Sequence, residues 1–162
     1  MKAEVTAEHA WLRRLVGEWT FEMVSLDGEA QPAGTMPGVE TVRALGDVWV
    51  LAEGRGQGPD GTPTHTQMVL GYEPQQRAFV GTWIGSMMNH LWIYRAGTLD
   101  AGQRLLALNA EGPSFDGTPG KMAQYRDEIE IVNADERLLH GNLQREDGSW
   151  SRFMTARYRR TG

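Results

Sequence analysis

Three side chains with ionisable or hydrogen-bonding tips alternate along residues 89–96. His90, Trp92 and Tyr94 are spaced two residues apart, so they share one face if this segment is a β-strand. An imidazole exchanges a proton near neutral pH and a phenol donates a hydrogen bond, so such a face can orient a small molecule. We therefore predict binding residues here. As the alternative, His90 or Tyr94 would act as acid or base on the bound molecule.

The enzyme alternative needs a charged partner, and Arg126 is the candidate. Arg126 and Glu128 lie in the carboxylate-rich segment 121–132, and an arginine inside a barrel could hold a substrate carboxylate in an isomerase, cyclase or decarboxylase. The segment also alternates, so its apolar set is expected inside and its charged set in solvent. The inward set is Tyr125, Ile129 and Ile131. Exposure of Arg126 and Glu128 would argue against the enzyme alternative. No Gly-x-Ser-x-Gly motif occurs, and we assign no catalytic residue.

Histidines are the other candidates for chemistry. A lone inward histidine could ligate haem iron, which makes haem binding through His90 or His140 a further alternative. No pair of histidines has the spacing of a zinc site, and the main prediction is therefore no metal and no cofactor. His9 falls within the predicted helix and is expected to be exposed.

Ten segments rich in β-branched and aromatic residues, separated by turn residues, are expected to be the strands that position these side chains. Asp147-Gly148, for example, is a hairpin dipeptide. The predicted strands cover residues 18–25, 39–45, 47–55, 64–72, 77–86, 89–96, 103–110, 121–132, 136–145 and 149–159. Short links make neighbouring strands antiparallel, which leaves a sandwich or a barrel.

One helix precedes the strands. It is predicted from Ala7 to Val16, with Trp11, Leu12 and Leu15 on one apolar face, and it can plug one end of a barrel. Barrel closure also removes exposed sheet edges. We therefore predict an all-β fold: an antiparallel up-and-down β-barrel of about ten strands with a short N-terminal capping helix, in a single domain over residues 1–162.

The alternation also predicts what lines the barrel. Aromatic and methionine side chains with a few polar tips are typical of a small-molecule site, and ten strands leave room for one. We predict that a small apolar or amphipathic molecule is bound by Met68, Trp83, His90, Trp92, Tyr94, Met154 and Tyr158. Gly81 and Gly85 are expected to leave space beside Trp83, and the loop from Leu26 to Gly38 is expected to gate the mouth.

The outer face of the same strands suggests an assembly role. Val80, Ile84, Leu91 and Ile93 would form an apolar outer patch that favours a homodimer. Both faces of residues 77–86 are apolar, so the sequence leaves open whether Trp83 faces the interior or belongs to this patch.

Bulk properties limit the partners. The net charge of −5 argues against nucleic acid binding, which needs clustered lysine and arginine. No apolar stretch approaches the length of a membrane span. The chain has no cysteine and its first residues lack the apolar run of a signal peptide, so we expect a cytoplasmic protein.

Several short motifs, in order along nearly the whole chain, resemble the DUF1579 family of bacterial proteins of unknown function. They are Gly17-Glu18-Trp19, Leu70-Gly71-Tyr72-Glu73-Pro74, Gly81-Thr82-Trp83-Ile84-Gly85-Ser86, Trp92-Ile93-Tyr94 and the closing Tyr158-Arg159-Arg160. The resemblance implies a relative of the lipocalin and calycin barrels. In such barrels the tryptophan of Gly-x-Trp packs at the closed end under an arginine from the last strand, here Arg157 or Arg159.

Overall fold

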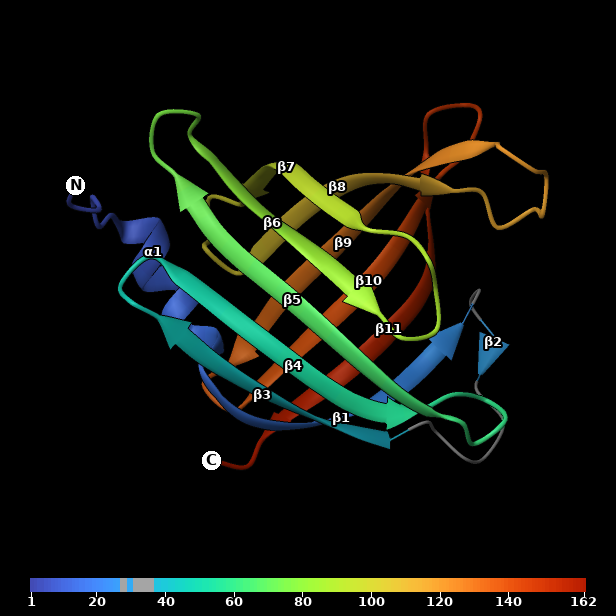
Figure 1. Ribbon diagram of the computed structural model, residues 1–162, viewed down its shortest axis with the longest axis horizontal. Helices are drawn as coiled ribbons and strands as arrows, with labels where there is room; N and C mark the ends of the chain where they lie inside the picture. Colours follow the sequence, from blue (N-terminus) through green and yellow to red (C-terminus); the bar gives the residue numbers. More distant parts are fainter. Residues whose placement is uncertain (27–28, 31–36) are drawn as a thin grey trace.

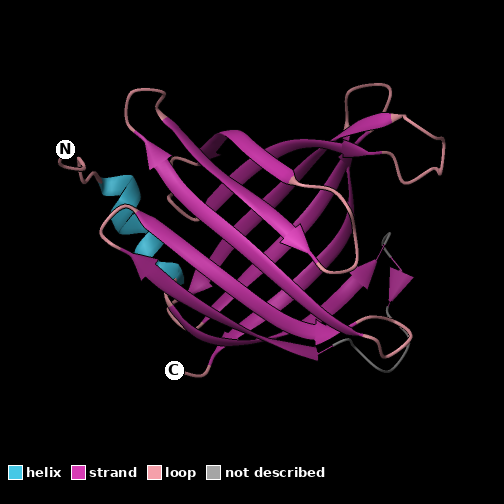
Figure 2. Cartoon of the chain, in the orientation of Figure 1, coloured by secondary structure: helices cyan, strands magenta, loops and turns pink. Residues whose placement is uncertain are grey.

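A closed antiparallel barrel forms the body of the protein (Figures 1 and 2). The computed structural model describes residues 1–26, 29–30 and 37–162. Its strands are β1 (Gly17–Leu26), β2 (Glu29–Ala30), β3 (Pro37–Leu45), β4 (Trp49–Gln57), β5 (Pro63–Glu73), β6 (Ala78–Gly85), β7 (Trp92–Leu99), β8 (Leu105–Pro113), β9 (Met122–Asn133), β10 (Glu136–Gln144) and β11 (Trp150–Arg160). Ten of them make the barrel, while β2 adds two residues beside the end of β1.

Hydrogen bonding between β11 and β1 closes the barrel, with Trp19 opposite Arg160 and Phe21 opposite Tyr158. Every other neighbouring pair is also antiparallel, which confirms the predicted fold class. The loop that we expected to gate the mouth, Leu26 to Gly38, lies largely outside the described residues.

The helix closes one end of the barrel, as predicted, although it is shorter than expected. It consists of α1 (Ala7–Leu12) followed by a 3-10 turn (Arg13–Leu15). Trp11 packs edge-on against Phe79 and donates from Nε1 to the carbonyl of Gln103 at 2.7 Å, so the helix is fixed to β6 and to the loop before β8.

His9 corrects one expectation, because it is buried rather than exposed. Its Nδ1 accepts a hydrogen bond from the backbone N–H of Thr6 and caps the helix, which leaves Nε2 to donate to the Tyr72 carbonyl at 3.0 Å. This histidine therefore joins the helix to the end of β5.

Trp19 lies at this closed end and is only 2% exposed. Its ring is flanked by the guanidinium groups of Arg160 at 4.2 Å and Arg137 at 4.7 Å. The arginines expected from the resemblance, Arg157 and Arg159, are not the partners. They face outward because they lie opposite Glu22 and Thr20, the outward residues of β1.

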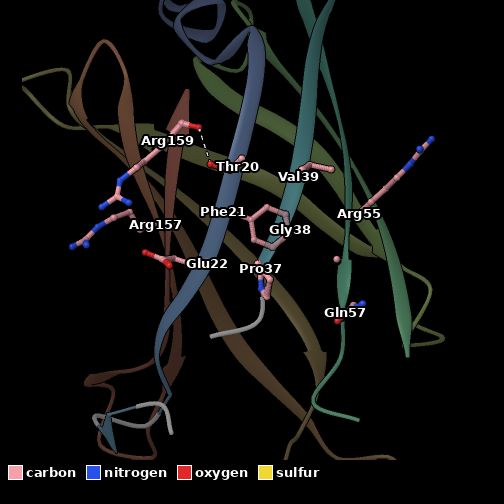
Figure 3. A pocket seen from close by; sticks show the side chains of 11 residues that line it. Thr20, Phe21, Glu22, Pro37, Gly38, Val39, Arg55, Gln57, Arg157 and Arg159 are labelled. Atoms are coloured by element: carbon pink, nitrogen blue, oxygen red, sulfur yellow. Dashed lines mark hydrogen bonds between the residues drawn. The ribbon is translucent and has the colours of Figure 1, made fainter. Parts of the chain in front are cut away.

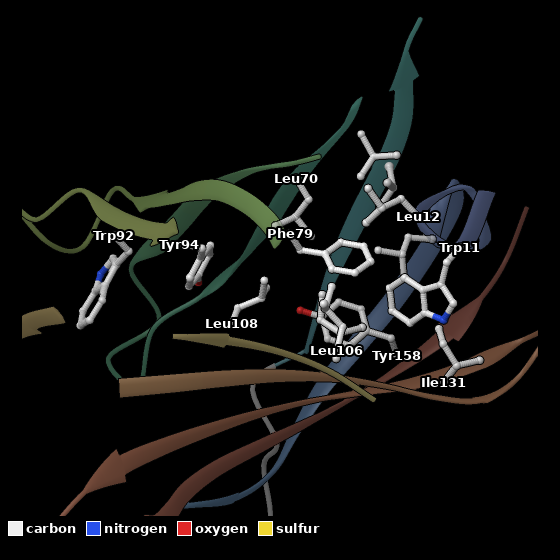
Figure 4. Packing of buried hydrophobic residues seen from close by; sticks show 14 of the residues in the cluster. Trp11, Leu12, Leu70, Phe79, Trp92, Tyr94, Leu106, Leu108, Ile131 and Tyr158 are labelled. Carbon is white, nitrogen blue, oxygen red and sulfur yellow. The ribbon is translucent and has the colours of Figure 1, made fainter. Parts of the chain in front are cut away.

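The apolar core extends along the barrel from the end that the helix closes. Trp11, Phe79 and Leu106 gather near the helix, while Trp92 and Tyr94 lie toward the opposite end (Figure 4).

Candidate functional site

A cavity of about 410 Å³ occupies the barrel interior. It extends from Leu15, at the helix, to Met87 and Phe115 in the loops at the other end. Most of its wall is apolar. Lining side chains come from most of the barrel strands and include Phe21, Val50, Ala52, Leu70, Ile129, Leu139 and Ala156.

Five of the seven predicted binding residues line this cavity: Met68, Trp83, Trp92, Met154 and Tyr158. Trp83 therefore faces inward, which the sequence left open. Trp92 is held by a hydrogen bond from its Nε1 to Met88 and by edge-on packing against Tyr125. Sequence reasoning did not pick out Phe153, which reaches the cavity because a bulge on β11 turns it inward beside Met154.

Gly81 and Gly85 do not leave the space that we expected beside Trp83. A Cβ at Gly81 would overlap the carbonyl of Val69, and one at Gly85 would overlap Met87 and the Trp83 ring. The volume beside these two glycines is already occupied by neighbouring atoms. Small side chains elsewhere in the cavity wall, Ala52 on β4 and Ala156 on β11, take up little of the interior.

Tyr94 stands behind the cavity wall and donates a hydrogen bond to Oδ2 of Asp127. Asp127 itself lines the cavity. Burial raises the pKa of Asp127 to about 6, against the lowering effect of the Tyr94 hydrogen bond, and the charge of Glu128 adds to the rise. Burial, and then the charge of Asp127, raises the pKa of Tyr94 well above its usual value.

Sequence reasoning missed Asp127, although the signal was present. Asp127 lies between Tyr125 and Ile129 on the face of β9 that was correctly expected to be inside. Its neighbours Arg126 and Glu128 lie on the outer face of β9, as predicted, but they are half-buried there rather than fully in solvent.

An ion pair also lies inside the barrel. Arg137, from β10, forms an ion pair with Glu40, from β3, and both residues line the cavity. The Arg137 guanidinium also lies 3.9 Å from the centre of the Tyr158 ring. The interior Arg–Glu pair is therefore Arg137 with Glu40, rather than the Arg126 and Glu128 considered from the sequence.

Tyr158 presents a hydroxyl to this cavity. No hydrogen bond joins the hydroxyl to any residue that the structure describes, although the side chain is only 6% exposed. Burial and the charge of Glu40 raise its pKa, so it remains a neutral phenol that can donate or accept a hydrogen bond.

His90 is placed differently from the expectation. It precedes β7, does not line the interior cavity, and lies in a groove on the outer wall. Its Nε2 lies 3.0 Å from the Glu111 carbonyl and must donate, since a carbonyl only accepts. The ladder between β7 and β8 has only two residue pairs, at Thr98 and Leu99, so His90 satisfies a carbonyl that the ladder leaves free.

The other residues weighed for chemistry also lie on the outer wall. His140 is hydrogen-bonded through Nδ1 to Thr155 and through Nε2 to Glu130, so both ring nitrogens are occupied. Arg126 stacks on the Trp150 ring at 4.2 Å and donates to Asn109. Among the described residues, no group of three His, Cys, Asp or Glu side chains could hold a metal ion.

Two larger grooves lie on the outside of the barrel, with volumes of about 570 and 680 Å³. Figure 3 shows the first, where Arg55, Arg157 and Arg159 surround Thr20 and Val39. Arg55, Arg159 and Val39 are exposed, so this groove is an open stretch of surface, whereas the interior cavity is enclosed by the barrel. In the described part of the chain, no helix is long and apolar enough to span a membrane.

Among known structures, a phycobiliprotein lyase shares the fold. The S-type phycobiliprotein lyase CPES from Guillardia theta is 12% identical with a TM-score of 0.58, over 98% of this chain and 94% of that one. A redesigned β-barrel is also 12% identical, with a TM-score of 0.48, over 92% of this chain and 93% of its own. A comparison with curated proteins found no match. The family described as "Protein of unknown function (DUF1579)" matches residues 4–160, and the chain therefore belongs to the DUF1579 family.

Proposed function

We propose that the protein binds a small apolar or amphipathic molecule inside the barrel. The observation that carries this proposal is the cavity of about 410 Å³, because it lies within the usual size range of ligand sites and combines an apolar wall with a few fixed polar groups. Each methylene that a ligand buries there would contribute about 0.8 kcal/mol to binding.

The cavity wall supports an adaptable rather than a rigid fit. Met68, Met87, Met88 and Met154 all line the cavity, and unbranched thioether side chains adjust to ligands of irregular shape. A barrel of this fold is a phycobiliprotein lyase in Guillardia theta, which agrees with the binding of a small molecule by this fold.

The enzyme and haem alternatives lose the residues on which they were based. His90, His140 and Arg126 do not line the cavity, and Tyr94, the other acid or base considered, stands behind the wall with its hydroxyl bonded to Asp127. Apolar contact for affinity and Tyr158 for orientation remain the better supported means of binding.

The test is a titration with N-phenyl-1-naphthylamine, an uncharged apolar dye whose fluorescence rises in apolar sites. Ala52→Trp would fill the cavity from β4, while Leu51→Trp adds the same side chain on the outward face of the same strand. We expect Ala52→Trp to weaken dye binding by at least about tenfold, or 1.4 kcal/mol, and Leu51→Trp to leave it unchanged. Equal dye affinity in both variants would mean that the dye binds outside the interior cavity, and it would refute the proposal. Native mass spectrometry of the purified protein would then identify any molecule that copurifies.

We also propose that the outer apolar patch supports a homodimer and that the protein is cytoplasmic. Ile84, Leu91 and Ile93 are 45%, 50% and 37% exposed, and Val80 beside them is half-buried. Analytical ultracentrifugation of the wild type and of Ile93→Glu would test the dimer. A wild type that remains monomeric at high concentration would exclude this role.

A further inference from the structure

Asp127 is an interior carboxylate that lacks a cationic partner. We propose that the cavity selects molecules whose polar end is a hydrogen-bond donor, above all a protonated amine, and that Asp127 receives this group. The inference rests on the proposed function, because it names the class of molecule that the same cavity would take.

The hydrogen bonding of Asp127 leaves it able to accept more. Tyr94 donates to Oδ2, and no described residue donates to Oδ1. No ion pair in the described part of the chain includes this carboxylate. An ionised carboxylate has about four acceptor positions, so a ligand with N–H groups could fill those that remain.

The other interior charges are already balanced. Arg137 is paired through one terminal nitrogen with Glu40 and is stacked between the rings of Trp19 and Tyr158, although its Nε has no hydrogen-bond partner among the described residues. Removing Glu40 from this pair to bind a ligand carboxylate would leave a buried charge without a partner, which is unfavourable. An anionic ligand would also meet the negative charge of Asp127. The interior therefore favours a cation over an anion.

Tyr158 adds a second contact for a donor group. Its hydroxyl oxygen can accept a hydrogen bond from an ammonium N–H, and no described residue occupies it. Tyr158 and Asp127 both line the cavity. The charge of Asp127 is the last of the causes that raise the pKa of Tyr158, after burial and Glu40.

Proton binding gives the inference a second readout. With a pKa of about 6, Asp127 carries a negative charge near pH 7.5 and loses most of it near pH 5. Tyr94 from β7 donates to it, and the ionisable groups that line the same cavity are Tyr158 from β11, Arg137 from β10 and Glu40 from β3, with Glu128 beside it on the outer face. The neighbouring strand β8 contributes only apolar side chains to the interior: Leu106, Leu108 and Ala110.

The experiment displaces bound N-phenyl-1-naphthylamine with three probes that share one chain and differ in their heads: decylamine, decanol and decanoate. Near pH 7.5 we expect decylamine to bind at least about tenfold tighter than decanoate. Asp127→Asn should remove this preference and leave decanol binding unchanged. Glu128→Gln is the matched control, because it removes a carboxylate from the outer face of the same strand.

Each outcome is decisive. Equal affinities for the amine and the acid in the wild type would overturn the inference while leaving the proposed function intact. Failure of all three probes to displace the dye would contradict both. If Asp127→Asn does not fold, the wild type alone decides, since decylamine affinity should fall by about tenfold between about pH 7.5 and pH 5. Decylamine stays protonated over this range, so a flat profile would refute the role of Asp127.

Discussion

Replacing Asp127 by asparagine should stabilise the folded protein at neutral pH. Asp127 is half-buried, and its position inside the barrel raises its pKa to about 6 against the ordinary value of 3.8, which is a rise of about two units. At about 1.4 kcal/mol per unit, the ionised group lowers the free energy of unfolding by up to about 3 kcal/mol. Asparagine keeps an oxygen that accepts the Tyr94 hydrogen bond and carries no charge, so most of this free energy should be recovered.

The pH dependence follows from the direction of the shift. Because the folded pKa lies above the unfolded one, the folded state binds the proton more tightly, and the penalty is complete only above about pH 6. It decreases as the pH falls toward the unfolded value. The gain from Asp127→Asn should therefore be about 3 kcal/mol near pH 7.5 and only about 0.5 kcal/mol near pH 4.

Urea unfolding, followed by tryptophan fluorescence at the two pH values, measures the difference directly. Glu128→Gln is again the control. It removes an ion pair to Arg152, whose side chain is 48% exposed, so its effect should stay below about 1 kcal/mol. An Asp127→Asn variant that is no more stable than the wild type near pH 7.5, or equally stabilised at both pH values, would refute the assignment of a buried, ionised Asp127.

Two further predictions concern charged and polar groups at other positions. Arg137→Ala should lower the free energy of unfolding by about 3–5 kcal/mol, because Glu40 loses its partner, and adding Glu40→Gln should recover part of this loss in the same urea assay. His90→Ala should cost about 1 kcal/mol, through the lost hydrogen bond to the Glu111 carbonyl, and leave the affinity for N-phenyl-1-naphthylamine unchanged. A marked loss of dye affinity in His90→Ala would show that this histidine reaches the ligand.

The barrel could be predicted from the sequence because its signals are local. Alternation and turn residues repeat along the chain, and each predicted strand overlaps an observed one. Much of the apolar cavity wall followed from the same alternation, which placed Met68, Met154 and Tyr158 inside, whereas the side of Trp83 was left open because both faces of its strand are apolar. The prediction of side-chain direction failed where the chain is not in a regular strand. His90 lies in the turn before β7 and not within a strand, so the period of two did not apply to it.

The ion pair inside the barrel could not be predicted from alternation, because it depends on contacts between distant segments. Arg137 and Glu40 meet across 97 positions of the chain, and only the closure of the barrel brings β10 near β3. Alternation alone could have placed Asp127 inside. Because carboxylates are usually exposed, however, Asp127 was grouped with the charged surface residues of its strand. The partner of Trp19 shows the same limit, since the register of β11 decides which arginine covers the ring.

Of the two interior carboxylates, Glu40 has a cationic partner and Asp127 does not, and this difference indicates different roles. Glu40 is neutralised by Arg137, and that pair is packed against aromatic rings at the closed end, where it helps to hold the barrel together. Asp127 has a single uncharged donor and faces the cavity. A buried charge without a counterion works against folding, whereas in a binding site it provides a specific contact for a complementary group. If asparagine at this position makes the protein more stable and less selective for amines, the carboxylate serves the ligand and not the fold.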